Sequence, residues 1–284
     1  MTENFDPQDY RSSLSPIWCP GCGLYAGNGA LTKALANLKI PKENVALISG
    51  IGCSARMAGY LDVYTMNVLH GRAIPVATGY KLARPDLTVI AAGGDGDILS
   101  IGAGHLPHAI RRNLDMTILL CDNRVYALTK GQTSPTTPRG ETLTSGALNN
   151  PVDPLLDVLA FMNTIGTGFL AQGLANKPEH LAGLIQRGIA YRGTAFISIQ
   201  FNCVTYNDQQ AFNDLRKNAF LLEDGKEVML PDGRKWIHDP SNYDLATQLM
   251  KVRLVDRPFI GVIYRGSEKE SCVEVAKKII EEKR

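Results

Sequence analysis

The sequence predicts an α/β fold built on a doubly wound, mostly parallel sheet. One observation is a β-branched apolar run at 87–92, followed by helical apolar spacing at 99–113 and a second apolar run at 116–121. A strand, a helix and a strand of these lengths form a βαβ unit, whose strands run parallel. The other observation is that strand and helix patterns continue to alternate along the chain, which is typical of a doubly wound sheet.

The remaining elements follow from apolar spacing and from the residues that end each segment. The further helices are expected at 24–38, 73–83, 154–162, 178–191 and 269–283. The further strands are expected at 45–48, 164–170, 195–200 and 259–264. The first two of these helices stop ahead of Pro41 and Pro85, because the residue before a proline is disfavoured in a helix.

Two long segments have the composition of loops. Residues 124–152 are rich in Gly, Pro, Ser and Thr, and residues 204–240 are irregular and charged. A loop as long as the first is usually functional when it lies inside a compact domain. We therefore expect 124–152 to contribute to a site and 204–240 to run over the surface.

Composition excludes several functional classes. The chain has 284 residues, of which 44% are hydrophobic and 20% charged, which is ordinary for a folded soluble protein. No apolar run approaches the roughly 18 residues that span a bilayer, and the polar start of the chain is unlike a secretory signal. The net charge of +2 comes without a basic block. We expect a cytoplasmic protein that binds neither membrane nor nucleic acid.

A glycine-rich turn predicts a metal–diphosphate site. Asp95 lies between two glycines after the first strand of the βαβ unit, and Asn123 follows the second strand. Ligands of open α/β sheets bind at the carboxyl ends of strands, so these side chains should lie together. Oxygen ligands suit Mg²⁺, and the glycines allow backbone N–H groups to approach a phosphate. A plain glycine-rich turn remains the alternative.

The cysteines raise a second question. Cys19 and Cys22 form a C-x-x-C pair, which is compatible with zinc, a redox disulfide, an iron–sulfur cluster or no ligand. A zinc ribbon usually adds a second such pair, whereas this chain offers single cysteines at Cys53 and Cys203. The residues alone leave zinc and iron–sulfur equally open. The last two cysteines are Cys121, in an expected strand, and Cys272, in the expected terminal helix. Both are predicted to be buried and to pack as small hydrophobic residues.

Six motifs in a fixed order resemble the β-subunit of the 2-oxoacid:ferredoxin oxidoreductases. They are "WCPGCG", "GIGCS", "HGRAIPVATG", "GDGDILSIG", "DNRVYALTKGQTSPTT" and "NCVTYND". The resemblance covers nearly the whole chain. It implies one thiamine-diphosphate-binding domain over 1–284, with a cluster-binding segment at about 1–55 and a C-terminal extension at about 204–284.

The resemblance also implies a ligand for each site. Asp95, Asn123 and the carbonyl of Val125 would hold Mg²⁺. Cys19, Cys22, Cys53 and Cys203 would hold a [4Fe–4S] cluster, for which four thiolates are the usual ligands. The residues expected around thiamine diphosphate are Ile51, Gly52, Cys53, Ser54, His70, Gly94, Asp95, Gly96, Asp97, Asn123, Val125, Tyr126, Ala127 and Leu128.

The activity that the resemblance implies is reversible oxidative decarboxylation of a 2-oxoacid. Coenzyme A is the co-substrate, and the products are an acyl-CoA, CO₂ and reduced ferredoxin. His70 and Lys130 are the residues of this chain expected to act in catalysis. Lys130 stands in "TKGQ", which is similar to members that accept 2-oxoglutarate, whereas pyruvate-specific members have a glycine there. Its ammonium would pair with the second carboxylate of the substrate.

A partner is implied as well, because thiamine enzymes need a glutamate on the aminopyrimidine ring. No Glu of this chain can be assigned to that role, so an α-subunit is expected to supply it in an αβ or (αβ)₂ complex. Three alternatives stay open. The chain could serve pyruvate, branched-chain or many 2-oxoacids; it could be a non-catalytic iron–sulfur electron-transfer subunit; or it could be a zinc-stabilised binding module.

Overall fold

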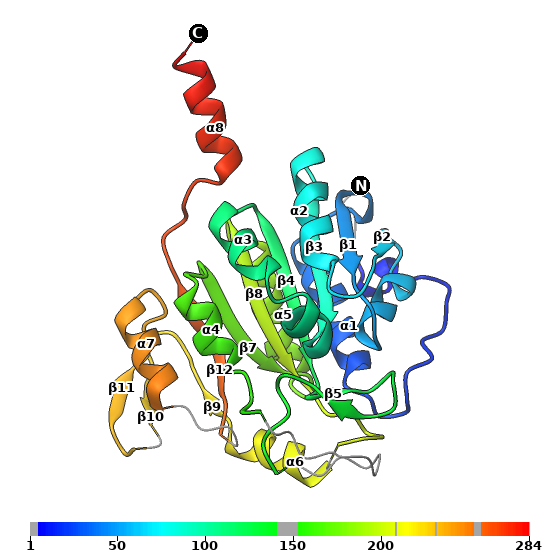
Figure 1. Ribbon diagram of the computed structural model, residues 1–284, viewed down its shortest axis with the longest axis vertical. Coiled ribbons are helices and arrows are strands. Elements are labelled where there is room, and N and C mark those ends of the chain that lie inside the picture. The colour runs from blue at the N-terminus through cyan, green and yellow to red at the C-terminus, as the bar shows by residue number, and fades with distance from the viewer. Residues whose placement is uncertain (1–4, 141–152, 208, 231, 253–256, 284) are drawn as a thin grey trace.

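A mostly parallel sheet forms the centre of the molecule (Figure 1). The computed structural model describes residues 5–283 except 141–152, 208, 231 and 253–256. In this part of the chain the sheet has eight strands, in the order β2 (Tyr64–Asn67), β1 (Val45–Ser49), β3 (Thr88–Gly94), β4 (Met116–Asp122), β8 (Thr194–Gln200), β7 (Phe169–Leu174), β12 (Phe259–Arg265) and β9 (Phe220–Leu221). The strands from β2 to β7 are parallel and β12 is antiparallel to β7. The predicted fold class is confirmed.

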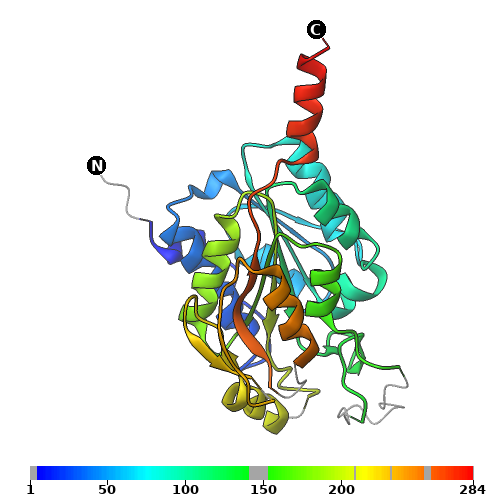
Figure 2. The same cartoon turned by 90° about the vertical axis from the view of Figure 1, so that its left-hand side faces the viewer.

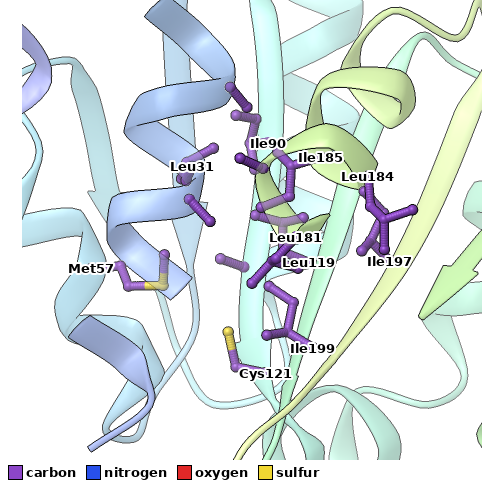
Figure 3. Close-up of a cluster of buried hydrophobic side chains, with 14 of the residues drawn as sticks. Leu31, Met57, Ile90, Leu119, Cys121, Leu181, Leu184, Ile185, Ile197 and Ile199 are labelled. Atoms are coloured by element: carbon purple, nitrogen blue, oxygen red, sulfur yellow. The ribbon is translucent and has the colours of Figure 1, made fainter. Parts of the chain in front are cut away.

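Helices cover both faces of the sheet (Figure 2). One face packs against α1 (Leu24–Asn37) and α5 (Pro178–Ile189). The opposite face packs against α2 (Ala73–Ala83), α3 (His105–Arg112), α4 (Val158–Thr164) and α7 (Tyr243–Val252). Strands buried on both faces explain the continuous apolar runs in the sequence. Figure 3 shows Leu31 of α1 and Leu181 of α5 meeting Leu119 and Ile197 of the sheet, all of them fully buried.

The remaining elements are short and lie around this core. They are the 3₁₀ turns Pro7–Tyr10, Lys42–Asn44 and Ser54–Tyr60, the β5 (Val125–Tyr126) and β6 (Gln132–Thr133) hairpin, α6 (Gln209–Asn218), the β10 (Glu227–Met229) and β11 (Lys235–Ile237) hairpin, and α8 (Cys272–Glu281). Figure 1 shows α8 standing away from the body of the molecule, and none of its residues is buried. No helix among the described residues is long and apolar enough to cross a bilayer.

Two predicted elements have different bounds in the structure. The helix expected at 99–113 is divided into a π turn, Asp97–Ile101, and α3. The N–H of Gly102 closes the π turn by donating to the carbonyl of Asp97 at 3.1 Å, and a Cβ on Gly102 would lie 2.6 Å from that oxygen. The strand expected at 164–170 is β7, which begins only at Phe169 because Gly166 ends α4 with φ +80°.

Three further expectations were incomplete or wrong. Strand β2 was not predicted, because all four of its residues are exposed and it lies at the edge of the sheet. Residues 204–240 were expected to be irregular, yet they contain α6 and the β10–β11 hairpin. The helix expected from 154 begins at Val158, after the Asp157 side chain accepts a hydrogen bond from the N–H of Ala160. The predicted loop 124–152 includes 141–152, which lie outside the described residues.

Candidate functional site

The carboxyl ends of β3 and β4 bring the predicted metal ligands together. The two strands are parallel neighbours, and Gly94 of β3 pairs with Cys121 of β4. The next residues, Asp95 on one strand and Asp122 and Asn123 on the other, therefore lie side by side. Asp95 is 2% exposed and Asn123 is 7% exposed. The sheet itself thus positions two buried oxygen-bearing side chains at one edge.

Asp95 carries the strongest electrostatic perturbation at this edge. Burial, and then the neighbouring Asp122, raise the pKa of Asp95 to about 7, although hydrogen bonds from Ser134 and Thr136 act in the opposite direction. The Thr136 hydroxyl lies 3.0 Å from Asp95 Oδ2 and 2.8 Å from Asp122 Oδ1. One hydroxyl proton serves only one of them at a time. Two buried carboxylates that lie side by side and share one hydroxyl donor fit the binding of a cation such as Mg²⁺.

The turn after β4 is held by side chains from distant parts of the chain. Gln200 Nε2 donates to Asp122 Oδ2 at 2.7 Å, and Asn207 donates to the carbonyl of Asn123. The N–H of Val125 donates to Asn123 Oδ1 at 3.2 Å, across Arg124, whose φ is +60°. These bonds fix the backbone that carries the predicted ligands.

A pocket opens beside this edge. The residues that line it are Ile51, Gly52, Cys53, Ser54, His70, Gly94, Asp95, Gly96, Asp97, Cys121, Asn123, Val125, Tyr126, Ala127, Leu128, Thr129 and Phe201. The structure therefore brings all fourteen residues expected around the cofactor to one pocket. The sequence analysis did not include Cys121, Thr129 or Phe201.

Asp97 organises the wall of this pocket. Its Oδ1 accepts hydrogen bonds from the N–H of Gly71 at 2.6 Å and from the N–H of Ile51 at 3.3 Å, which ties two loops together. Its Oδ2 is buried without a hydrogen-bond partner. A Cβ on Gly50 would lie 1.8 Å from that oxygen. Burial raises the pKa of Asp97, and the two N–H donors oppose this. Asp97 therefore fixes the backbone of two loops beside the pocket.

His70 and Tyr126 form the other side of the pocket. Their rings stack with centroids 6.3 Å apart, and His70 Nδ1 lies 3.4 Å from Asp97 Oδ1. The Tyr126 hydroxyl donates to the carbonyl of Gly96 at 3.1 Å. A Cβ on Gly96 would lie 2.2 Å from the Tyr126 ring. The second glycine of the GDG turn thus makes room for an aromatic wall.

Lys130 lies beyond the pocket lining, on its exposed rim. It follows Thr129, which does line the pocket, in a turn closed by bonds from Lys130 N–H to the Ala127 carbonyl (3.2 Å) and from Gly131 N–H to the Tyr126 carbonyl (2.9 Å). Its φ is +84°, a conformation that favours glycine. The structure therefore places this lysine near the pocket but not in its wall.

The four predicted cluster ligands are neighbours. Burial first, and then the charges of Cys53, Cys203 and Cys19, raise the pKa of the Cys22 thiol to about 11. Cys53 lines the pocket, and Cys203 packs with Val125 in a small buried cluster. Among the described residues, no three His, Cys, Asp or Glu side chains form a group that could hold a metal ion. The cysteines thus share one region without the tight grouping of a single-ion site.

Polar groups near the sulfurs of this region act against the effect of burial on their pKa values. Burial raises the pKa of Cys203, and the backbone N–H groups of Thr205, Tyr206 and Asn207 oppose that rise. The N–H of Leu24 has the same effect on the pKa of Cys22. Such donors stabilise thiolate over thiol, so the region suits sulfur ligands that lose their protons to a metal.

The two other cysteines differ from each other. Cys121 is buried and its pKa is raised to about 12, chiefly by burial. It lies in the hydrophobic cluster of Figure 3 as predicted, although it also borders the pocket. The prediction that Cys272 is buried was wrong, because this thiol is exposed at the start of α8. Val273 of α8 packs against the core and is partly buried, whereas the neighbouring Cys272 stays exposed.

Several site residues had no local signal. Gln200 and Asp122 are 78 positions apart, and Thr136 and Asp95 are 41 apart, so their hydrogen bonds depend on the fold. Nothing in the local sequence pairs these residues. A polar side chain directly after a strand is a local signal, and it predicted Asp95 and Asn123.

Comparisons with known proteins place this geometry among thiamine enzymes. A family model described as the C-terminal TPP-binding domain of thiamine pyrophosphate enzymes matches residues 50–199. The chain is 38% identical over 278 residues to the 2-oxoacid:ferredoxin oxidoreductase 2 subunit beta of Aeropyrum pernix, covering 96% of this chain and 87% of the relative. It is 35% identical over 271 residues to the 2-oxoglutarate synthase subunit KorB of Methanocaldococcus jannaschii, covering 95% of each.

A solved structure is similar over almost the full length. It is a 2-oxoglutarate:ferredoxin oxidoreductase from Magnetococcus marinus with 2-oxoglutarate, coenzyme A and succinyl-CoA bound. The TM-score is 0.89 at 38% sequence identity, and the match covers 99% of this chain and 91% of the other. The fold described above is therefore shared with that enzyme over almost the whole chain.

Proposed function

Because the chain belongs to the β-subunit family of the 2-oxoacid:ferredoxin oxidoreductases, we propose that it catalyses CoA-dependent oxidative decarboxylation of 2-oxoglutarate. The proposed products are succinyl-CoA, CO₂ and reduced ferredoxin, in a reversible reaction. One observation carries the proposal: the pocket at the ends of β3 and β4 shares Cys53 with the proposed cluster site. The site of decarboxylation and the site of electron removal would thus lie next to each other. A cytoplasmic location is part of the proposal, because free thiols stay reduced there.

The pocket residues support binding of thiamine diphosphate with Mg²⁺. When bound, this cofactor supplies an electron sink for loss of CO₂ from a 2-oxoacid. The side chains of Asp95 and Asn123 and the carbonyl of Val125 would hold the metal, and Asp95 would give up its proton to do so. Asp97 holds the loops at Ile51 and Gly71 in place. His70 lies in the pocket wall, where it can contact cofactor or substrate.

We propose that the four cysteines hold a [4Fe–4S] cluster rather than a structural zinc. A zinc ribbon usually pairs one C-x-x-C with a second, whereas this chain offers one such pair and two single cysteines. A cluster between Cys53, which borders the pocket, and Cys19, which is exposed, would lead electrons toward ferredoxin.

A metal analysis tests this cluster. Iron and acid-labile sulfide are measured on the complex of this chain and its α-subunit, purified without oxygen, with Cys53→Ala as the test variant and Cys272→Ser as the control. We expect about four of each per chain in the wild type and the control, and loss of both in Cys53→Ala. Zinc without sulfide would refute the cluster and favour a binding module. Activity that survives Asp95→Ala would favour a non-catalytic electron-transfer subunit.

The mouth of the pocket supports a requirement for the α-subunit. Two exposed apolar side chains from separate loops line it, namely Ile51, which is 44% exposed, and Leu128, which is 46% exposed. Exposed apolar side chains gathered around a pocket mark a protein contact. No glutamate is among the residues that line the pocket. We propose that the α-subunit covers the mouth and supplies that group in an αβ or (αβ)₂ complex, and that this chain alone shows no turnover.

Lys130 is the proposed determinant for 2-oxoglutarate. At φ +84° a lysine is about 1–2 kcal/mol less favourable than a glycine. The presence of lysine despite this backbone strain supports a function for its side chain. A charged hydrogen bond to the second carboxylate contributes about 1.5–3 kcal/mol. Lys130→Ala should therefore lower kcat/KM for 2-oxoglutarate about ten- to hundredfold, mainly through KM, and change that for pyruvate little.

The control for this experiment is Lys130→Arg, which keeps the positive charge and should lose much less. Equal losses on 2-oxoglutarate and pyruvate in Lys130→Ala would refute the specificity role. Wild-type enzyme that uses pyruvate, branched-chain 2-oxoacids and 2-oxoglutarate equally well would show a broad substrate range instead.

A further inference from the structure

Thr205 contacts two of the four proposed cluster ligands. Its hydroxyl donates a hydrogen bond to Cys19 Sγ at 3.4 Å, while its backbone N–H opposes the rise in the pKa of the Cys203 thiol that burial causes. Cys19 and Cys203 are 184 positions apart, and the loop of Cys19 packs on that of Cys203, with Val204 lying 3.7 Å from the Cβ position of Gly21. One residue therefore joins the two loops through their sulfurs.

These two ligands differ in their exposure to solvent. Cys203 is buried beside Val125 of the cofactor pocket, whereas Cys19 is exposed. Backbone N–H groups already surround the buried sulfur. The exposed sulfur receives its hydrogen bond from a side chain, and a side chain can be changed without moving the backbone.

We propose that the Thr205 hydroxyl sets the reduction potential of the cluster by donating to the Cys19 thiolate at its solvent-facing corner. This inference rests on the proposed function, since it requires the cluster. The reduced cluster carries one more negative charge than the oxidised cluster. A hydrogen-bond donor on a ligand sulfur stabilises the more negative form, so it raises the potential. Thr205 is a positioning residue in this account, because it acts through Cys19.

The test is a redox titration monitored by electron paramagnetic resonance on the anaerobically purified complex with the α-subunit. Thr205→Val removes the hydroxyl, nearly keeps the shape of the side chain and leaves the backbone N–H to Cys203. We expect about a fivefold fall in the ratio of reduced to oxidised cluster at a fixed ambient potential. At 59 mV per tenfold for one electron, this is a downward shift of about 40 mV. Thr205→Ser keeps the hydroxyl and should titrate as the wild type does.

Iron and sulfide content separate the possible failures. Wild-type protein without iron and sulfide would overturn the proposed function and this inference with it. Full iron and sulfide in Thr205→Val with an unchanged midpoint potential would overturn the inference alone, as would a shift in Thr205→Ser equal to that in Thr205→Val. If Thr205→Val does not assemble its cluster, Thr205→Ala supplies the hydroxyl-free measurement, and its expected shift has the same sign.

Discussion

Gly96→Ala should weaken cofactor binding because it moves an aromatic wall of the pocket. The φ of Gly96 is −65°, so an alanine meets no backbone strain there. The obstacle is space, since its Cβ would lie 2.2 Å from Cε1 of Tyr126 and 2.5 Å from Cζ. An ordinary contact begins near 3.4 Å, so the ring must retreat by about 3.4 − 2.2 = 1.2 Å.

That movement has two costs. Overpacking of this size costs about 1–3 kcal/mol. The ring also loses the bond from its hydroxyl to the Gly96 carbonyl, 3.1 Å long, which contributes about 0.5–1.5 kcal/mol. Because Tyr126 follows Val125, the retreat also pulls on the turn that carries the proposed metal ligands. The two costs together come to about 1.5–4.5 kcal/mol in stability. We expect about 2–3 kcal/mol of this to fall on the cofactor-bound conformation, which corresponds to a rise in Kd of roughly 30- to 150-fold.

Isothermal titration of thiamine diphosphate into the Mg²⁺-loaded complex measures this loss. Gly104→Ala is the matched control, because nothing lies within 4 Å of its Cβ position. A double variant identifies the cause: Tyr126→Ala removes the ring, so adding Gly96→Ala to it should cost little more. An unchanged Kd in Gly96→Ala would refute the reasoning, and so would a Gly96→Ala penalty that is equally large with and without the ring.

Two other predictions concern the metal and the exposed thiol. Since the pKa of Asp95 is raised to about 7, its proton competes with Mg²⁺ below that pH, and binding of Mg²⁺ with thiamine diphosphate should weaken from pH 8 to pH 6 by up to about tenfold per unit below 7. Titration calorimetry at the two pH values measures this, and Asp95→Asn, which binds weakly, should lose most of the pH dependence; an equally steep dependence there would assign it to another group. A thiol reagent should modify Cys272 in the native chain and spare Cys121, as read by mass spectrometry, and the reverse order would contradict the burial described here.

The central βαβ region was predictable from sequence because its signals are local. The apolar run at 87–92 predicted β3, and the run at 116–121 predicted β4 to within a residue. The predictions of elements failed where the local sequence pattern was weak. Strand β2 has no buried side chain, so its sequence carries no apolar pattern that would predict a strand. It is a strand because its backbone pairs with β1. The π turn before α3 depends on the backbone of Gly102 meeting Asp97, which apolar spacing cannot reveal.

The candidate site divided in the same way. Asp95 and Asn123 were predictable because each directly follows a strand, and parallel strands end at one edge. Most of the other pocket residues were expected through the family resemblance of their motifs. The Thr136 bridge between two carboxylates and the bond from Gln200 to Asp122 had no such signal. Those contacts arise only when β4, β8 and the loop after β6 are folded together.

The turn that carries Lys130 closes on itself through backbone bonds, from Lys130 to Ala127 and from Gly131 to Tyr126. Neither bond depends on the side chain at position 130. On the role proposed for Lys130, a single codon change there would alter which acid is accepted, while the proposed metal ligands, the cysteines and the sheet stay as they are. Homologous subunits descended from one gene would in this way accept different 2-oxoacids and keep the same cofactor-binding residues.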